Sequence, residues 1–172
     1  RQALDAMSRA FVKEDAQGPD EDPPERPVSP QPNYVTPRGL NILQNSEESL
    51  LAGLKGFEGA QADESRKKKK RELERDLRYI RARLESAIPV DPANQPKEQI
   101  RFGAAVVLQR EDGLKKSLRI VGEDEAEEGG ETLSWAAPFA QTLFGLKAGQ
   151  SLYWETEAGA EKWSVVSIGY GV

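Results

Sequence analysis

Three acidic residues, Glu58, Asp63 and Glu64, stand in and just after a glycine-rich break between two segments of helical periodicity. Carboxylate oxygens are ligands that Mg²⁺ prefers, so acids at the end of a helical arm could help hold a metal ion that activates water. In that interpretation Asp63 and Glu64 are the metal ligands. Composition alone favours a plainer one, in which Asp63 and Glu64 complement the positive end of a helix and Glu58 is a solvated loop acid.

A block of six consecutive cations follows these acids. Its members are Arg66, Lys67, Lys68, Lys69, Lys70 and Arg71. Like charges in a row repel one another, so this clustering has a cost. The block is either a solvated helix face, because Lys and Arg are good helix formers, or a surface that contacts phosphates or an acidic wall. Aromatic residues are not interleaved with the cations, so stacking on single-stranded bases is not indicated.

Two predicted helices position the acids. Thr36 and Pro37 have the residue types of an N-cap and a first helical position, and we expect the helix to run to about Lys55. The glycine-containing stretch 56–61 is then the turn. A second helix is expected from about residue 62 or 63 to about residue 87, and it stops before Pro89.

Each predicted helix carries one apolar face. The apolar positions are Leu40, Leu43, Leu50, Leu54 and Phe57 in the first helix and Leu73, Leu77, Ile80, Leu84 and Ala87 in the second. Their spacing of three, four and seven predicts that the two faces pack together, which gives an antiparallel helical hairpin, or coiled coil, over residues 36–90. Glu47 stands on the first face where an apolar residue is expected.

The segments on either side of the hairpin have different compositions. Residues 1–35 are rich in Pro and acidic residues and predict a disordered or extended tail. Residues 91–99 contain two prolines and predict a linker. Residues 100–172 predict a compact domain of strands around one short helix, so the fold class is α+β. The strands are expected at 101–108, 118–121, 151–155 and 162–168, and the helix at 137–146.

The amino-acid composition excludes several kinds of catalysis and metal binding. The chain has no Cys and no His, which excludes thiol chemistry, disulfides, zinc ligation by these residues and histidine acid–base catalysis. A net charge of -5 argues against a protein that coats nucleic acid. No apolar run approaches the ~20 residues of a membrane helix, and no signal-peptide pattern opens the chain. We therefore expect a soluble, cytoplasmic, monomeric protein.

The C-terminal part carries a signature of ordered motifs. It consists of Ile100-Arg101-Phe102-Gly103, residues 120–126, Ser134-Trp135 with Pro138, and the glycines at 145 and 149. In order and spacing these motifs resemble the C-terminal domain of the bacterial Gre (GreA/GreB) transcription elongation factors. The hairpin resembles the family's N-terminal coiled coil. Residues 26–40, which include Tyr34-Val35-Thr36-Pro37, resemble the opening of a GreB-like subgroup.

This resemblance implies a partner and a mechanism. The C-terminal domain would have an FKBP-like fold and would dock around Trp135, Pro138 and Phe139 at the rim of the secondary channel of RNA polymerase. The hairpin would enter the channel, where Glu58, Asp63 and Glu64 would help the polymerase hold Mg²⁺ and hydrolyse a backtracked transcript. The protein would then be a stimulator and not an enzyme, with no cofactor of its own and only indirect contact with RNA and DNA.

The sequence also departs from the family pattern. Ala136-Ala137 replaces the Asp-Ser or Ser that commonly precedes the rim proline, and Gly149-Gln150 replaces Gly-Asp. The tip reads Gln61-Ala62-Asp63-Glu64-Ser65, and a first helix of about 19 residues would span only about 28 Å. Two alternatives therefore stay open. One is a non-cleaving channel regulator that resembles the nucleoside diphosphate kinase regulator family, and the other is an FKBP-like interaction module that does not act on polymerase.

Overall fold

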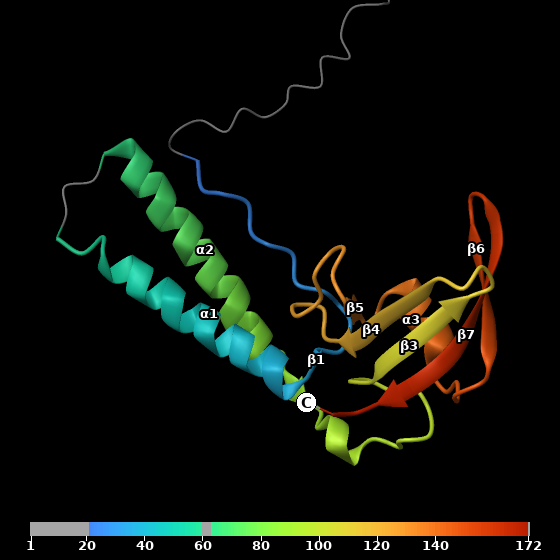
Figure 1. Ribbon diagram of the computed structural model, residues 1–172. Coiled ribbons are helices and arrows are strands. Elements are labelled where there is room, and N and C mark those ends of the chain that lie inside the picture. The colour runs from blue at the N-terminus through green and yellow to red at the C-terminus, as the bar shows by residue number, and fades with distance from the viewer. Residues whose placement is uncertain (1–20, 60–62, 172) are drawn as a thin grey trace, which may run out of the picture.

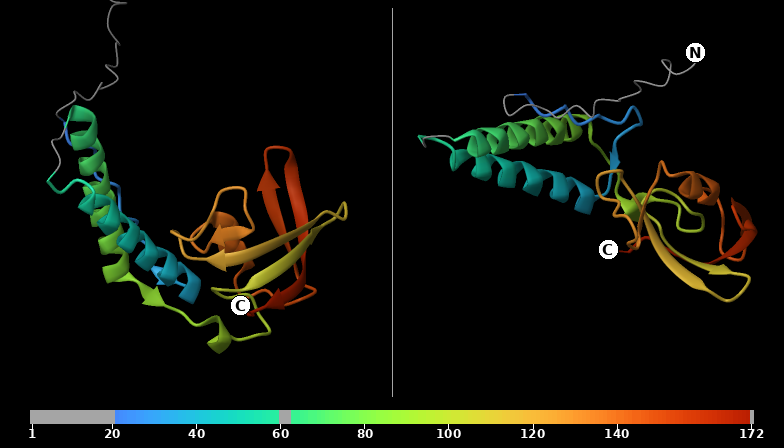
Figure 2. Two further views of the ribbon diagram at one scale, coloured as in Figure 1. Left: turned by 60° about the vertical axis from the view of Figure 1, so that its left-hand side comes forward. Right: turned by 90° about the horizontal axis from the view of Figure 1, so that it is seen from above.

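The computed structural model describes residues 21–59 and 63–171, and its most prominent feature is a helical hairpin. Helix α1 spans Pro37–Lys55 and helix α2 spans Glu64–Ser86. They lie side by side, run in opposite directions and project away from a β-sheet (Figures 1 and 2). The predicted helices are confirmed, and the predicted turn at 56–61 lies partly outside the described residues.

Both helices begin at a side-chain cap. Thr36 accepts a hydrogen bond from the Gly39 amide at 2.9 Å, and Asp63 accepts one from the Arg66 amide at 2.8 Å. Each cap satisfies one of the amides that the first helical turn leaves without a partner. Asp63 therefore lies one position before α2, and the first acidic residue inside the helix is Glu64.

The hairpin is held together by the apolar faces that the sequence predicts. Leu43, Leu77 and Ile80 are buried between the helices, with Leu40, Leu50 and Leu84 packed at their edges. Glu47, which interrupts the first face, pairs with Arg81 of α2 at 3.5 Å. An exposed ion pair of this kind stabilises little, but it lets a charged residue stand at the margin of the seam.

Two short strands close the base of the hairpin. Strand β1 (Tyr34–Val35) pairs in parallel with β2 (Ile88–Pro89), so the start of α1 is tied to the end of α2. Because proline has no amide hydrogen to donate, this pair of strands forms few backbone hydrogen bonds. One of them runs from the Ile88 amide to the Asn33 carbonyl at 2.8 Å. These strands were not predicted. A 3₁₀ turn, η1 (Pro92–Asn94), begins the connection to the sheet.

The sheet has the strand order β5-β4-β3-β7-β6. Its strands are β3 (Ala105–Arg110), β4 (Lys115–Val121), β5 (Thr132–Ser134), β6 (Ser151–Thr156) and β7 (Gly159–Gly169). All neighbours are antiparallel except β4 and β5, which are parallel. This curled, mostly antiparallel sheet together with the helices confirms the α+β class.

The core of this sheet lies between its inner face and a short helix, α3 (Pro138–Leu143). Alternate residues of the strands point inward, among them Val106 and Leu108 of β3 and Ile120 of β4. Helix α3 is shorter than the 137–146 expected, because Phe144 leaves the helical region and Gly145 takes φ +84°. The predicted strands are present with shifted ends, and β5 was not predicted.

No helix among the described residues is long and apolar enough to cross a membrane.

Candidate functional site

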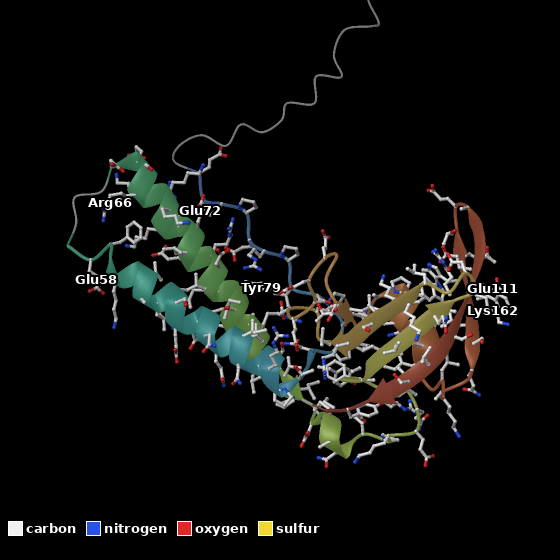
Figure 3. The ribbon with its side chains drawn as sticks, viewed as in Figure 1. Glu58, Arg66, Glu72, Tyr79, Glu111 and Lys162 are labelled. Carbon is white, nitrogen blue, oxygen red and sulfur yellow. The ribbon has the colours of Figure 1, made fainter. Side chains whose placement is uncertain are left out.

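The three acids of interest lie at the free end of the hairpin. Glu58 is exposed in the turn after α1, and Figure 3 shows it far from Glu111, which marks the outer end of the sheet. Asp63 uses one oxygen to cap α2, and Glu64 forms an ion pair with Lys67 at 3.3 Å. The plainer interpretation, in which Asp63 and Glu64 complement a helix start, is therefore part of their role.

The described acids at this end of the hairpin do not form a ready-made metal centre. Among the residues that the structure describes, no three acidic side chains lie close enough together to hold a metal ion. Asp63 retains a second carboxylate oxygen, and Glu64 is exposed, so oxygen ligands of the kind that suits Mg²⁺ are present. They would have to be completed by ligands from another molecule.

Arg66 fixes the two helices to each other at this end. Its guanidinium donates to the Gly56 carbonyl at 3.3 Å and lies 5.3 Å above the centre of the Phe57 ring. These contacts join the first turn of α2 to the turn that follows α1. Arg66 was predicted only as part of a basic patch.

Most of the other cations in the block have acidic neighbours. Lys69 lies 3.9 Å from Glu72, Lys70 lies 3.9 Å from Glu74, and Arg71 lies 3.7 Å from Asp22. The first two pairs are one helical turn apart, as exposed pairs on a helix commonly are. The positive charge of the block is therefore largely compensated by neighbouring acids.

The three residues expected at a docking rim do not share one environment. Pro138 is exposed as the first residue of α3. Phe139 is half-buried with its ring edge-on to Trp154 at 5.1 Å, and Trp135 is half-buried against Tyr34 at 5.1 Å. The two aromatic residues thus support the fold, and Pro138 is the member of the set that a partner could reach.

A buried arginine connects the hairpin to the sheet. Arg83 of α2 is 1% exposed, and its guanidinium lies 2.6 Å from Asp124 and 3.4 Å from Glu123, in the loop after β4. It also donates to the Asn33 side chain at 2.7 Å. A guanidinium shared among such acceptors is compensated in its charge and fixed in its direction.

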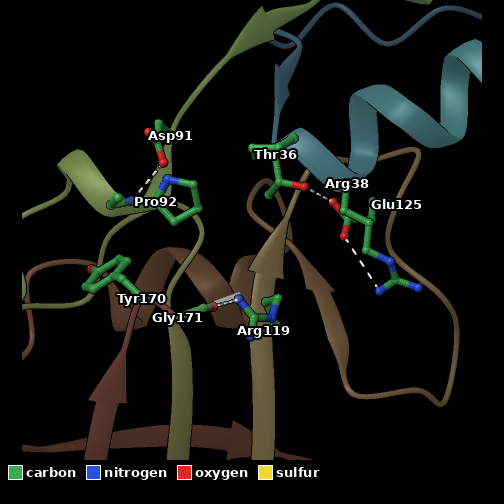
Figure 4. A pocket seen from close by; sticks show the side chains of 10 residues that line it. Thr36, Arg38, Asp91, Pro92, Arg119, Glu125, Tyr170 and Gly171 are labelled. Carbon is green, nitrogen blue, oxygen red and sulfur yellow. Dashed lines mark hydrogen bonds and ion pairs between the residues drawn. The ribbon is translucent and has the colours of Figure 1, made fainter.

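Two further contacts complete this joint. The Tyr79 hydroxyl donates to Asp124 at 2.5 Å, and burial, with this hydrogen bond second, raises the pKa of Tyr79 to about 12. On the α1 side the Thr36 hydroxyl donates to the buried Glu125 carboxylate, and Arg38 lies 4.0 Å from the other oxygen (Figure 4). Three consecutive acids of one loop therefore hold the hairpin base.

The chain is similar in sequence to known proteins over most of its length. The family model described as transcription elongation factor, GreA/GreB, C-term matches residues 95–170. The transcription elongation factor GreB of Neisseria meningitidis serogroup B is 31% identical over 153 residues, which cover 80% of this chain and 94% of that protein. The chain belongs to the GreA/GreB family.

Two further proteins are similar to this chain. GreB of Pseudomonas aeruginosa is 36% identical over 104 residues, covering 60% of this GreA/GreB family member and 62% of the relative. Among solved structures, the GreA/GreB factor from Nitrosomonas europaea is 23% identical, with coverage of 80% and 99% and a TM-score of 0.41.

In this GreA/GreB family member the contacts between the hairpin base and the loop after β4 were not predicted from the sequence, although two features of the sequence pointed to them. The run Glu123-Asp124-Glu125 was considered only as part of the motif at residues 120–126, and Arg83 was not singled out. Arg83 follows Ile80 by three residues, so it lies on the apolar face of the second helix, where an unexplained cation calls for an acidic partner.

A cavity of about 360 Å³ opens beside the joint. Its walls come from the start of α1, from η1 and from the end of β7 (Figure 4). Pro37, Pro92 and Tyr170 line it together with Arg119, whose guanidinium donates to the Gly171 carbonyl at 3.0 Å. The joint is thus tightly packed at the acidic loop and open toward η1.

Proposed function

We propose that this protein binds RNA polymerase, inserts the hairpin into the secondary channel and promotes cleavage of backtracked transcripts. The single observation that supports the proposal is a hairpin that projects from the sheet, carries Glu58, Asp63 and Glu64 at its free end and belongs to a GreA/GreB family member. The sheet domain, residues 100–172, would be the FKBP-like part that stays at the channel rim. Residues 36–90 would act as the coiled-coil arm.

In this proposal the acids complete a site that belongs to the polymerase. Asp63 and Glu64 would supply oxygen ligands to a Mg²⁺ ion that the two proteins share, and that ion would activate water for hydrolysis of the RNA phosphodiester. Glu58 would orient the water or add negative charge beside it. Since the described acids are not assembled into a cluster, the polymerase must bring its own ligands to meet them.

Docking in this proposal uses the exposed end of α3. Pro138 would contact the rim, while Trp135 and Phe139 would hold the surface in shape from beneath. The cations of residues 66–71 would lie near the channel wall and would make only indirect contact with nucleic acid, because most of them already face acidic side chains.

The direct test uses stalled, backtracked polymerase with Mg²⁺, and it measures release of the 3′ RNA fragment with and without the protein. The informative variant is Asp63→Asn with Glu64→Gln. Asn caps helices about as well as Asp, so the change removes charge and leaves α2 capped. We expect cleavage stimulation to fall by roughly 10- to 100-fold, the effect typical of losing a group that supports a metal site, with polymerase binding unchanged.

Glu48→Gln is the matched control, because Glu48 is an exposed acid on α1 away from the tip. Stimulation should be unaffected by it. Wild-type protein that does not accelerate fragment release over polymerase alone would rule out the cleavage role.

A second candidate function keeps the polymerase and drops the chemistry. It is favoured by the length of α1, whose 19 residues span about 28 Å, and by the capping role of Asp63. An arm that stops short of the active site would occupy the channel and exclude other factors. Competition with a cleavage-active factor, without fragment release of its own, would select this function.

A further inference from the structure

The cavity beside the joint, the joint cavity, combines apolar walls with a buried carboxylate. Its apolar walls are formed by Pro37, Pro92, Ala93 and Tyr170. Glu125 lines it from the loop after β4 (Figure 4). The volume of about 360 Å³ falls in the range of roughly 300–1,000 Å³ that is usual for small-molecule sites, which are mostly apolar with a few fixed polar groups.

Glu125 is 6% exposed, and one of its carboxylate oxygens has no hydrogen-bond donor. The Thr36 hydroxyl donates to Oε1 at the start of α1, where the helix dipole favours negative charge. Among the described residues no donor lies within hydrogen-bond distance of Oε2, and Nη1 of Arg38 is 4.0 Å away. Because a buried oxygen without a donor costs free energy, an N–H group brought by a ligand would be bound favourably at Oε2.

Arg38 holds this oxygen only loosely. Its side chain is 70% exposed, and its distance of 4.0 Å from Oε2 is longer than a hydrogen bond. An ion pair with one exposed partner and no hydrogen bond stabilises little and is screened by salt. A small cation that enters the joint cavity can therefore replace Arg38 at Oε2 with a shorter, charge-assisted hydrogen bond.

Two more charged side chains line the joint cavity. Arg119 donates to the Gly171 carbonyl, so its positive charge is held at one wall. Asp91 is exposed, and it accepts a hydrogen bond from the Ala93 amide at 2.9 Å; Figure 4 shows it across the cavity from Glu125. Two acids and two arginines thus line the cavity, so a ligand with a single positive charge meets no net repulsion.

We propose that the joint cavity binds a small organic ammonium ion. The ammonium group donates to Oε2 of Glu125, and the apolar body of the ligand lies against the walls formed by Pro37, Pro92 and Tyr170. An anion would meet the buried carboxylate, and an uncharged apolar molecule would leave Oε2 without a donor. The charge of the ligand therefore decides which molecules bind.

A ligand in the joint cavity contacts both parts of the molecule. Pro37 belongs to the first turn of the hairpin, whereas Pro92 and Tyr170 belong to the connection after the hairpin and to the end of the sheet domain. Binding to this folded arrangement and not to the unfolded chain stabilises it by mass action. The ligand would therefore strengthen the attachment of the hairpin to the sheet.

This inference does not depend on transcript cleavage and is tested on the full chain without polymerase. The probe is phenethylamine, a protonated amine on an apolar ring, and its titration is followed by the backbone amide resonances of the protein. The amides of Ala93 and Gly171 in the cavity walls should shift until the site is saturated, and that of Gly113 in the β3–β4 turn should stay in place. Phenethyl alcohol, which has a hydroxyl in place of the ammonium group, should bind roughly tenfold more weakly or worse.

Two substitutions should change the affinity in opposite directions. Glu125→Gln keeps the shape of the side chain and removes its charge, so phenethylamine should bind roughly tenfold more weakly or worse. Arg38→Gln removes the cation that competes for Oε2, so binding should tighten by roughly two- to fivefold. Because Arg38 is exposed, this second variant tests the proposal even if Glu125→Gln folds poorly.

Glu155→Gln and Lys116→Gln are the matched controls, because they make the same changes in net charge at exposed positions of the sheet outside the joint cavity. Neither should change the affinity for phenethylamine measurably. The proposal is overturned if phenethylamine does not shift the amides of the cavity walls, or if phenethyl alcohol binds as tightly. It is also overturned if folded Glu125→Gln protein keeps the wild-type affinity, or if Arg38→Gln tightens binding no more than Lys116→Gln does.

Discussion

Individual residues at the joint show how closely the hairpin base approaches the loop after β4. A Cβ built on Gly122 would lie 2.4 Å from the Tyr34 carbonyl oxygen, and one built on Gly39 would lie 2.9 Å from a Glu125 carboxylate oxygen. The obstacle at Gly122 is backbone, which cannot move aside as a side chain can. Gly122 therefore permits the contact between β1 and the acidic loop.

Gly122→Ala should destabilise the protein by about 1–3 kcal/mol, because the new methyl group forces β1 away from the loop. Urea unfolding measures the change. Gly130→Ala is the control, since the nearest atoms to its Cβ lie at an ordinary 3.5 Å. Equal losses in the two variants would mean that the close approach at Gly122 is not what the substitution disturbs.

The ionisation of Tyr79 should make the stability of the protein depend on pH. Its pKa is raised to about 12, mainly by burial, while an unfolded tyrosine ionises near pH 10. Below about pH 10 the residue is neutral in both states and its bond to Asp124 contributes fully. As pH rises toward 12 the unfolded state ionises first, so this contribution is lost.

The measurement is the melting temperature of wild type and of Tyr79→Phe between about pH 9 and 11.5. The wild type should be the more stable near pH 9, and the difference should shrink as the pH rises. A difference that stays constant over this range would mean that the hydroxyl of Tyr79 is not held neutral by the fold.

At the scale of elements, the parts that could be predicted are those with local causes. The helices were found because Thr36 and Pro37 mark a start and because apolar residues repeat over several turns. Strands β3, β4, β6 and β7 were found because they are long enough to show a pattern. The pairs β1–β2 and β4–β5 were not, because strands of two or three residues form only where tertiary contacts bring them together.

The features of the candidate site were likewise only partly predictable from the sequence. The order of acids and glycines placed Glu58, Asp63 and Glu64 at the hairpin tip, since position on a hairpin follows from the chain order. Composition did not reveal that Phe139 packs on Trp154 or that Arg66 braces the turn, because those contacts depend on how separate segments meet in space. The N-terminal segment that runs along α2 was expected only as an extended or disordered tail for the same reason.

For the whole molecule, the direction of the hairpin depends on the buried cluster around Arg83. The helices and the sheet have separate hydrophobic cores, and where the two parts meet Tyr34 of β1 packs against Phe102 and Trp135. We expect the angle between the parts to depend mainly on Arg83 with Asp124 and Glu123, and on Thr36 with Glu125. Charged hydrogen bonds are directional, which suits them to fixing an orientation.

Arg83→Met should therefore free the hairpin as well as weaken the fold. It leaves Asp124 without its cation and Asn33 without a donor, and removing one partner of a buried pair costs about 3–5 kcal/mol. The chain has no Cys, so Lys55→Cys at the end of α1 and Glu157→Cys in the β6–β7 turn give two unique spin-label sites. Double electron–electron resonance between them should give a narrow distance distribution in the parent and a broad one with Arg83→Met.

Two comparisons make this result decisive. Asp124→Asn keeps the shape of the partner and removes its charge, so it should broaden the distribution even if Arg83→Met folds poorly. Arg81→Gln breaks only the exposed pair with Glu47 inside the hairpin and should leave the distribution narrow. If Asp124→Asn leaves the distance distribution unchanged, the ion pair does not aim the hairpin. The tip acids would then owe their position to the short β1–β2 pair and to the chain connection at η1.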